Sequence, residues 1–114
     1  MTTTLQKQVL IGARALIADR VHWTRGTLAC SAEGVRVPWH DPSASRWCVQ
    51  GAIYRAAYNL VDDIAQAMRI GTELIRSMSP TGGSSLLIGY LPQVNDRQGH
   101  AAVLAAIDKA LVVP

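Results

Sequence analysis

Cys48 and His100 are the residues of this sequence whose types best suit catalysis. A cysteine thiolate paired with a histidine is the nucleophile of cysteine hydrolases, and a third polar group orients the imidazole. Asn95 and Asp96 precede His100 closely enough to be candidates for that role. The thiol of such a site needs a depressed pKa, which a helix N-terminus or a neighbouring imidazolium supplies. The pattern therefore raises a hydrolase hypothesis that depends on the surroundings of Cys48.

The residues before Cys48 predict a helix that buries it. Asp41 is a typical N-cap and Pro42 a typical first helical residue, so we expect a helix over 42–58. Cys48 then lies about two turns inside this helix, on the face opposite Arg46 and Gln50, where the field of the helix terminus has faded. We expect Cys48 to be buried and unreactive, and its replacement by serine to cost about 1 to 3 kcal/mol.

Three other segments have the spacing of amphipathic helices. Apolar residues recur every three or four positions in 5–20, in 62–78 and in 100–111. Asp62 or Asp63 is expected to cap the middle one, which should be continuous. A linker is expected at 79–85 and a short helical piece at 86–91, ended by Pro92. Together with the helix expected over 42–58, these segments make the chain mostly helical.

One short β-hairpin is expected between the first two helices. Residues 27–30 and 35–38 have strand character, and Gly34 suits the turn between them. The predicted fold class is α+β, mostly helical, with four to five helices and this hairpin. At 114 residues the chain is expected to form a single compact domain over 1–114.

Composition points to a folded protein of the cell interior. Hydrophobic residues make up 49% and charged residues 17% of the chain, which is enough apolar side chain for a core. No secretion signal and no bilayer-spanning run is recognisable, so a cytoplasmic protein without membrane contact is expected. Cys30 and Cys48 are accordingly expected to be free thiols.

Metal and nucleic-acid sites have weaker support. The three histidines and two cysteines show none of the close spacings that build a metal site, so no metal and no cofactor is expected. Residues 64–76 resemble a helix-turn-helix, but Arg69 occupies the usual position of the turn glycine. The formal net charge is +3 and the arginines are scattered, which keeps nucleic-acid binding as an alternative function.

The segment 94–100, VNDRQGH, is expected to be a structural turn that starts the last helix. Asn95 and Asp96 have short side chains that accept backbone N–H bonds, and Gly99 can adopt conformations closed to other residues. These local properties explain the segment without an active site.

The order of these features resembles a family of small bacterial and phage proteins that share a domain of unknown function. The resemblance covers nearly the whole chain and rests on an amphipathic first helix and on the following residues: Trp23 and Gly26; Asp41 and Pro42; Arg46, Trp47, Cys48, Gly51 and Ala52; and Asn95, Asp96, Gly99 and His100. It implies a compact, mostly helical domain with these boundaries and supplies no mechanism.

The expected function is that of a small non-catalytic binding or regulatory module carried by a phage or another mobile element. Arginine and tryptophan near loops suit recognition of a protein partner, and Trp23, Arg25 and Trp39 are the predicted contact residues. The competing explanation is that both tryptophans close the core around the hairpin. The identity of the partner and the oligomeric state are left open by the sequence.

Overall fold

A computed structural model describes residues 3–78 and 94–112 of the chain. Its elements follow in the order α1 (Thr4–Ile17), η1 (Arg20–His22), β1 (Ala29–Cys30), β2 (Arg46–Trp47), α2 (Val49–Val61), α3 (Ile64–Ser77), η3 (Val94–Gln98) and α5 (His100–Val112). Helices dominate and the two strands form an antiparallel sheet, which confirms the predicted fold class. The linker and short helix predicted for 79–85 and 86–91 lie outside the described residues.

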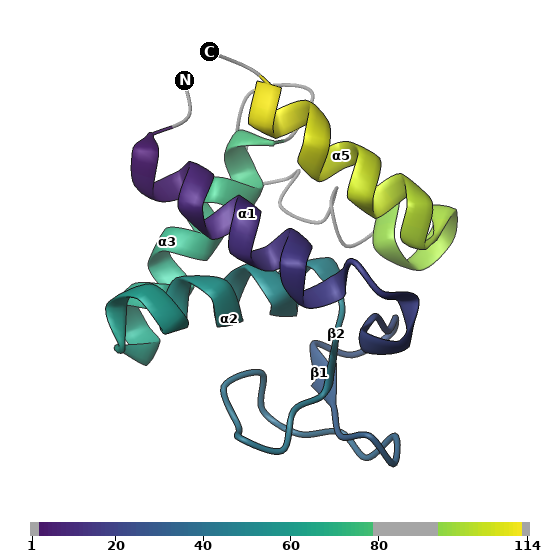
Figure 1. Cartoon of the computed structure of the whole chain (residues 1–114). Helices are drawn as coiled ribbons and strands as arrows, with labels where there is room; N and C mark the ends of the chain where they lie inside the picture. The colour runs from purple at the N-terminus through teal and green to yellow at the C-terminus, as the bar shows by residue number, and fades with distance from the viewer. Residues whose placement is uncertain (1–2, 79–93, 113–114) are drawn as a thin grey trace.

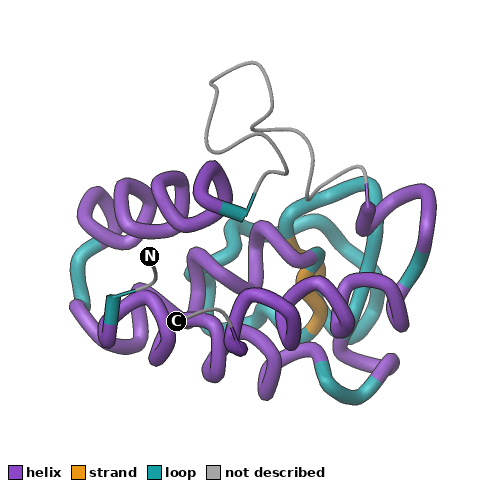
Figure 2. The backbone as a smooth tube through the Cα atoms, turned by 90° about the horizontal axis from the view of Figure 1, so that it is seen from above, coloured by secondary structure: helices purple, strands orange, loops and turns teal. Residues whose placement is uncertain are grey.

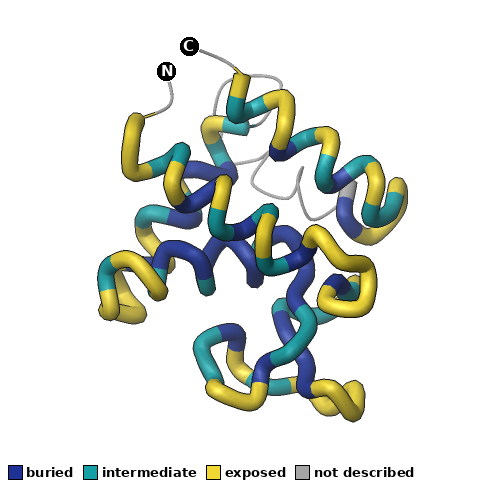
Figure 3. Tube along the Cα trace, in the orientation of Figure 1, coloured by how far each residue is buried: buried dark blue, intermediate teal, exposed yellow. Residues whose placement is uncertain are grey.

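Helix α1 lies between α5 on one side and α2 on the other, and α2 in turn packs against α3 (Figure 1). The shared core takes its largest fully buried side chains from all four helices, including Leu10, Ile53, Leu74 and Ile107. Along each of these helices buried stretches of the chain alternate with exposed ones (Figure 3). The two short strands lie among loops (Figure 2), and in the view of Figure 1 they lie below the helices.

Local signals predicted α1 well. Thr3 is its N-cap, with a reciprocal pair of hydrogen bonds of 3.1 Å between Thr3 and Gln6 that forms a capping box. Val9, Ala13 and Ile17 are buried as the periodicity requires. The helix ends at Ile17, three residues earlier than predicted, because Asp19 instead caps the short η1 turn through the N–H of Val21.

The predicted start of the second helix was wrong. The Oδ1 atom of Asp41 accepts hydrogen bonds from the N–H and the hydroxyl of Ser43, at 2.8 and 2.6 Å, and so closes a local Asx-type turn. The chain then runs extended through β2, and α2 begins only at Val49. An aspartate that accepts an N–H two residues ahead is common to both motifs, so the sequence could not separate them.

The hairpin prediction placed the turn correctly and the second strand wrongly. Gly34 adopts a φ of 85°, and the N–H of Ser31 donates to the carbonyl of Val35 at 2.8 Å. Residues 35–38 contribute just one isolated bridge, from Arg36 to Cys30. The strand that pairs with β1 is β2, with Ala29 opposite Trp47 and Cys30 opposite Arg46.

Helix α3 is continuous, as predicted. The carboxylate of Asp63 accepts the N–H of Gln66 at 2.8 Å, while Asp62 ends α2 with a left-handed φ of 54°. No turn interrupts α3 near Arg69, so residues 64–76 do not form a helix-turn-helix. Helix α5 begins at His100, which confirms the predicted start of the last helix.

The longest helices of the described residues, α1 and α3, have 14 residues each. None of the helices in this part of the chain combines the length and apolar character that a membrane crossing requires.

Candidate functional site

Two loops meet at the N-terminus of α2, and the buried side chain of Asn95 joins them. Its Oδ1 atom accepts hydrogen bonds from the indole Nε1 of Trp23 at 2.6 Å and from the backbone N–H of Val49 at 2.9 Å. Its Nδ2 atom donates to the carbonyl of Thr24 at 3.1 Å and to Oδ1 of Asp96 at 3.0 Å. Asn95 is fully buried, so this set of bonds compensates the cost of removing the amide from water.

Asn95 and Asp96 belong to η3, a single π-helical segment, followed by Gly99 with a φ of 98°. The predicted turn before α5 is therefore present, and it takes the form of a π-helical turn. Its two polar side chains do not cap α5, however. Asn95 satisfies the first N–H of α2, and Asp96 accepts the N–H of Gly26 at 3.2 Å.

Cys48 is the N-cap of α2, which corrects the prediction that it lies two turns inside a helix. Its backbone is extended, with φ −74° and ψ 174°, and its Sγ atom accepts the N–H of Gly51 at 3.4 Å. The N–H of Cys48 donates to the carbonyl of Leu28 at 3.2 Å. The residue is 6% exposed, so the predicted burial is confirmed although its reason was wrong.

The surroundings of Cys48 do not favour a thiolate. Burial raises the pKa of the Cys48 thiol, and the negative charge of Asp96 raises it further. The N–H groups of Gly51 and Gln50 oppose this effect, but the pKa remains above its ordinary value. A thiol with a raised pKa is a weak nucleophile at neutral pH.

His100 makes other contacts. Its Nε2 atom lies 2.6 Å from the carbonyl oxygen of Ile17, so this nitrogen carries the hydrogen and donates it. Its ring lies against the indole of Trp23, with the centroids 5.5 Å apart. Among the four residues of the hydrolase hypothesis, the structure groups Cys48, Asn95 and Asp96 at the start of α2 and gives the imidazole Nε2 of His100 a structural partner.

We predict that Cys48 reacts slowly with iodoacetamide in the folded protein at neutral pH. Because the raised pKa keeps the thiol protonated, the rate should rise only at a pH above about 8.5, the ordinary pKa of cysteine. The measurement is the labelling rate of a Cys30→Ser variant, in which Cys48 is the remaining thiol, before and after unfolding in urea. Labelling of the folded protein at the unfolded rate near pH 7 would contradict the prediction.

The N-cap position also changes what is expected of Cys48→Ser. Serine is among the preferred N-cap residues, and its hydroxyl can accept the N–H that the sulfur now accepts. The destabilisation expected from a hydroxyl in an apolar site therefore no longer follows.

The three predicted contact residues differ in exposure. Trp23 and Trp39 belong to the hydrophobic core and are 8% and 5% exposed. Arg25 is exposed, with its guanidinium carbon 5.2 Å from the centre of the Trp23 ring and its Nη1 donating to the carbonyl of Asp96 at 3.1 Å. Contact between these residues and a partner stays a prediction. Because Trp23 and Trp39 are buried, Arg25 is the one of the three whose side chain is available to a partner.

A small pocket of about 200 Å³ opens beside this arginine. It is lined by Gly26, Thr27, Leu28, Cys48, Gln50 and Asp96. Arg25 adjoins it, since it precedes Gly26 and bonds to the backbone of Asp96. The described residues contain no group of three histidine, cysteine, aspartate or glutamate side chains that could hold a metal ion.

Sequence reasoning missed the roles of Asn95 and Gly51. Asn95 was expected to accept backbone N–H bonds within the turn at 94–100, yet its side chain bonds to Trp23, Thr24 and Val49. Gly51 allows α2 to approach β1, because a Cβ atom there would lie 2.0 Å from the carbonyl oxygen of Leu28. A glycine inside the helix predicted over 42–58 was the one available signal.

A family model described as "Family of unknown function (DUF6197)" matches residues 1–112. No curated protein and no solved structure matches the chain.

Proposed function

The chain belongs to this family of unknown function, and we propose that it is a non-catalytic binding module that recognises a protein partner through Arg25 and the adjoining pocket. The observation that carries the proposal is the placement of Arg25. Its side chain is exposed but already held in position by the Trp23 ring and the carbonyl of Asp96.

A side chain ordered before binding loses little conformational freedom when a partner arrives. Arginine also forms paired hydrogen bonds with carboxylates and is enriched among residues that dominate binding energy. Trp23 is itself fixed by its hydrogen bond to Asn95. The buried Asn95 thus fixes the Trp23 ring, and this ring in turn holds the guanidinium group of Arg25 in place.

The pocket beside Arg25 suggests what the partner presents. Its volume of about 200 Å³ can take one side chain, and its lining combines the apolar Leu28 with the polar Thr27 and Gln50 and with Asp96. We propose that a partner places a carboxylate on Arg25 and an adjacent uncharged residue in this pocket. A carboxylate-bearing protein segment fits the net charge of +3.

The raised pKa of Cys48 is the reason to favour binding over cysteine catalysis at the same pocket. The continuous α3 removes the motif on which the nucleic-acid alternative was based. Nucleic-acid binding through the scattered arginines remains the alternative, and the binding experiment below distinguishes it by nuclease treatment.

We predict that Arg25→Ala strongly weakens partner binding. Full-length wild-type protein is used as bait in a lysate of the native host, and co-eluting proteins are identified and their affinities measured. Loss of a dominant arginine contact costs about 2 kcal/mol or more, which is roughly a 30-fold loss of affinity. Arg69→Ala, which alters an exposed arginine on α3, is the matched control and should bind like wild type.

The melting temperature of Arg25→Ala must stay close to that of wild type for the comparison to hold. A partner retained equally by Arg25→Ala would contradict the proposal. Capture that disappears after nuclease treatment would favour the nucleic-acid alternative instead.

A further inference from the structure

Arg25 and Asp96 carry opposite charges and lie side by side at the small pocket, but they form no ion pair. Arg25 donates from Nη1 to the backbone carbonyl of Asp96 at 3.1 Å, and its guanidinium does not reach the carboxylate of that residue. Asp96 lines the pocket, and its Oδ1 atom accepts the N–H of Gly26 at 3.2 Å and the Nδ2–H of Asn95 at 3.0 Å. No other residue in the described part of the chain forms an ion pair with either of them.

Both side chains can still bind a ligand. Among the residues that the structure describes, no acceptor is bonded to Nε or Nη2 of Arg25, and no donor is bonded to Oδ2 of Asp96. Both residues are exposed, so a ligand can reach them. A guanidinium binds carboxylates, and a carboxylate oxygen accepts N–H groups. The two residues therefore fit a ligand that presents a carboxylate and an N–H donor a short distance apart.

The N-terminus of α2 does not offer a competing site for the carboxylate. The N–H of Val49 donates to Asn95 at 2.9 Å, and the N–H groups of Gln50 and Gly51 point to the sulfur of Cys48. Because these donors are already paired, the adjoining guanidinium is the group that can bind an anion here.

We infer that the site binds the C-terminal residue of a protein chain, with its α-carboxylate on Arg25, its backbone N–H on Asp96 and its uncharged side chain in the pocket. The inference rests on the proposed function and narrows it, since it states which carboxylate the partner presents. On the last residue of a chain, all three groups are attached to one Cα atom. This short spacing suits two charged residues that are themselves in contact and a pocket of about 200 Å³ that takes one side chain.

An acidic side chain inside the partner's sequence fits less well. Neighbouring side chains of an extended segment point to opposite sides, so an internal aspartate or glutamate on Arg25 would turn the next residue away from the pocket. The residue after that one lies roughly 7 Å further along the segment. A terminal residue makes all three contacts without such a span.

The experiment is an NMR titration of the isotope-labelled full chain with a short peptide, followed by the amide signals of Gly26 and Gln50. The peptide is acetyl-Gly-Gly-Gly-Val, made once with a free C-terminal carboxylate and once as the C-terminal amide. The free acid should shift both signals with a Kd below about 5 mM, a weak affinity that suits the few contacts of one residue. The amide should bind at least about tenfold more weakly, because it lacks the charge that Arg25 binds.

Asp96→Asn tests the second contact. Asparagine keeps an oxygen that can accept the N–H groups of Gly26 and Asn95, but it replaces Oδ2 by an amide donor. The free-acid peptide should bind at least about fivefold more weakly, because its own N–H then meets a donor. Arg25→Ala should weaken the same peptide by at least about tenfold. Melting temperatures close to that of wild type verify that both variants are folded.

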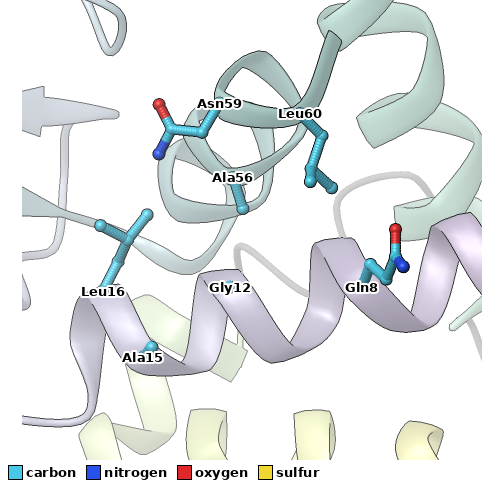
Figure 4. Close-up of a pocket in the computed structure, with 7 residues that line it drawn as sticks. All are labelled: Gln8, Gly12, Ala15, Leu16, Ala56, Asn59 and Leu60. Atoms are coloured by element: carbon cyan, nitrogen blue, oxygen red, sulfur yellow. The ribbon is translucent and has the colours of Figure 1, made fainter.

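Leu60→Ala is the matched control. Leu60 lines a larger hollow of about 280 Å³ between α1 and α2, and none of the residues that line this hollow is charged (Figure 4). The side chain of Leu60 is 49% exposed, so the fold should persist. This variant should bind the free-acid peptide like wild type, because a hollow without charge does not select a carboxylate.

Equal binding of the acid and the amide, or no binding of either, would overturn the inference, as would an Asp96→Asn variant that binds the acid like wild type. Free valine is a third probe, and tighter binding of valine than of the acetylated peptide would overturn it by assigning the site to a free amino acid. None of these results affects the proposed function, which fails if the partner captured from a lysate does not depend on Arg25. If the inference holds, carboxypeptidase treatment of the lysate abolishes the capture of that partner.

Discussion

Replacement of Asn95 by alanine is expected to lower the free energy of unfolding by about 3 to 5 kcal/mol, because it leaves several buried polar groups without partners. The indole N–H of Trp23 and the backbone N–H of Val49 would lose their shared acceptor, and the carbonyl of Thr24 would lose its donor. The first two groups are buried, so water cannot readily replace the missing oxygen. Urea unfolding followed by tryptophan fluorescence measures the change.

Asn59→Ala is the matched control. Asn59 is exposed near the end of α2 and accepts a hydrogen bond of 3.3 Å from the side chain of Arg55. Its replacement should change stability by no more than about 0.5 kcal/mol. A loss of less than about 1 kcal/mol in Asn95→Ala would show that the loops rearrange to satisfy the freed groups, against the typical cost of 1 to 3 kcal/mol for each.

Gly51→Ala is expected to destabilise the protein by about 3 kcal/mol or more, at or beyond the upper end of typical overpacking costs. The new Cβ atom would lie 2.0 Å from the carbonyl oxygen of Leu28. That oxygen accepts the N–H of Cys48, so it cannot move without breaking the link between β1 and the start of α2. The steric cost exceeds the roughly 1 kcal/mol that alanine gains over glycine in a helix.

Gly12→Ala tests the same exchange where the contact is less severe. The nearest atom to its new Cβ would be the Cβ of Ala56 at 3.2 Å, so a shift of a few tenths of an ångström relieves the contact. Its effect should be smaller than that of Gly51→Ala by at least about 2 kcal/mol. Urea unfolding curves of the two variants provide the comparison. Equal stability of both variants would mean that α2 can slide away from Leu28 at little cost.

The family resemblance drew together residues that the structure places in one region. Trp23, Gly26, Cys48, Asn95 and Asp96 come from three separate stretches of the sequence, yet hydrogen bonds and the small pocket connect them around the N-terminus of α2. The sequence identified these residues but assigned several of them wrong roles. Cys48 was expected inside a helix, and Asn95 was expected to serve its own turn.

The sequence by itself determined the features that depend on near neighbours. Apolar spacing set α1, α3 and α5, Asp63 set the start of α3, and Gly34 set a turn with positive φ. The cap and the turn rest on interactions within a few residues, such as the 2.8 Å bond from Gln66 to Asp63. The apolar spacing shows which face of each helix must be buried, whichever element buries it.

The tertiary structure alone decided where α2 begins and what Asn95 binds. Asp41 satisfies the same local hydrogen-bond pattern in an Asx turn as in a helix cap, so pairing of Arg46 and Trp47 with β1 selected the extended conformation. Asn95 lies next to Asp96 in sequence, but its other partners are Trp23, Thr24 and Val49. A buried amide must pair with whatever polar groups are buried beside it. Which groups those are depends on how the helices pack, and local sequence does not contain that information.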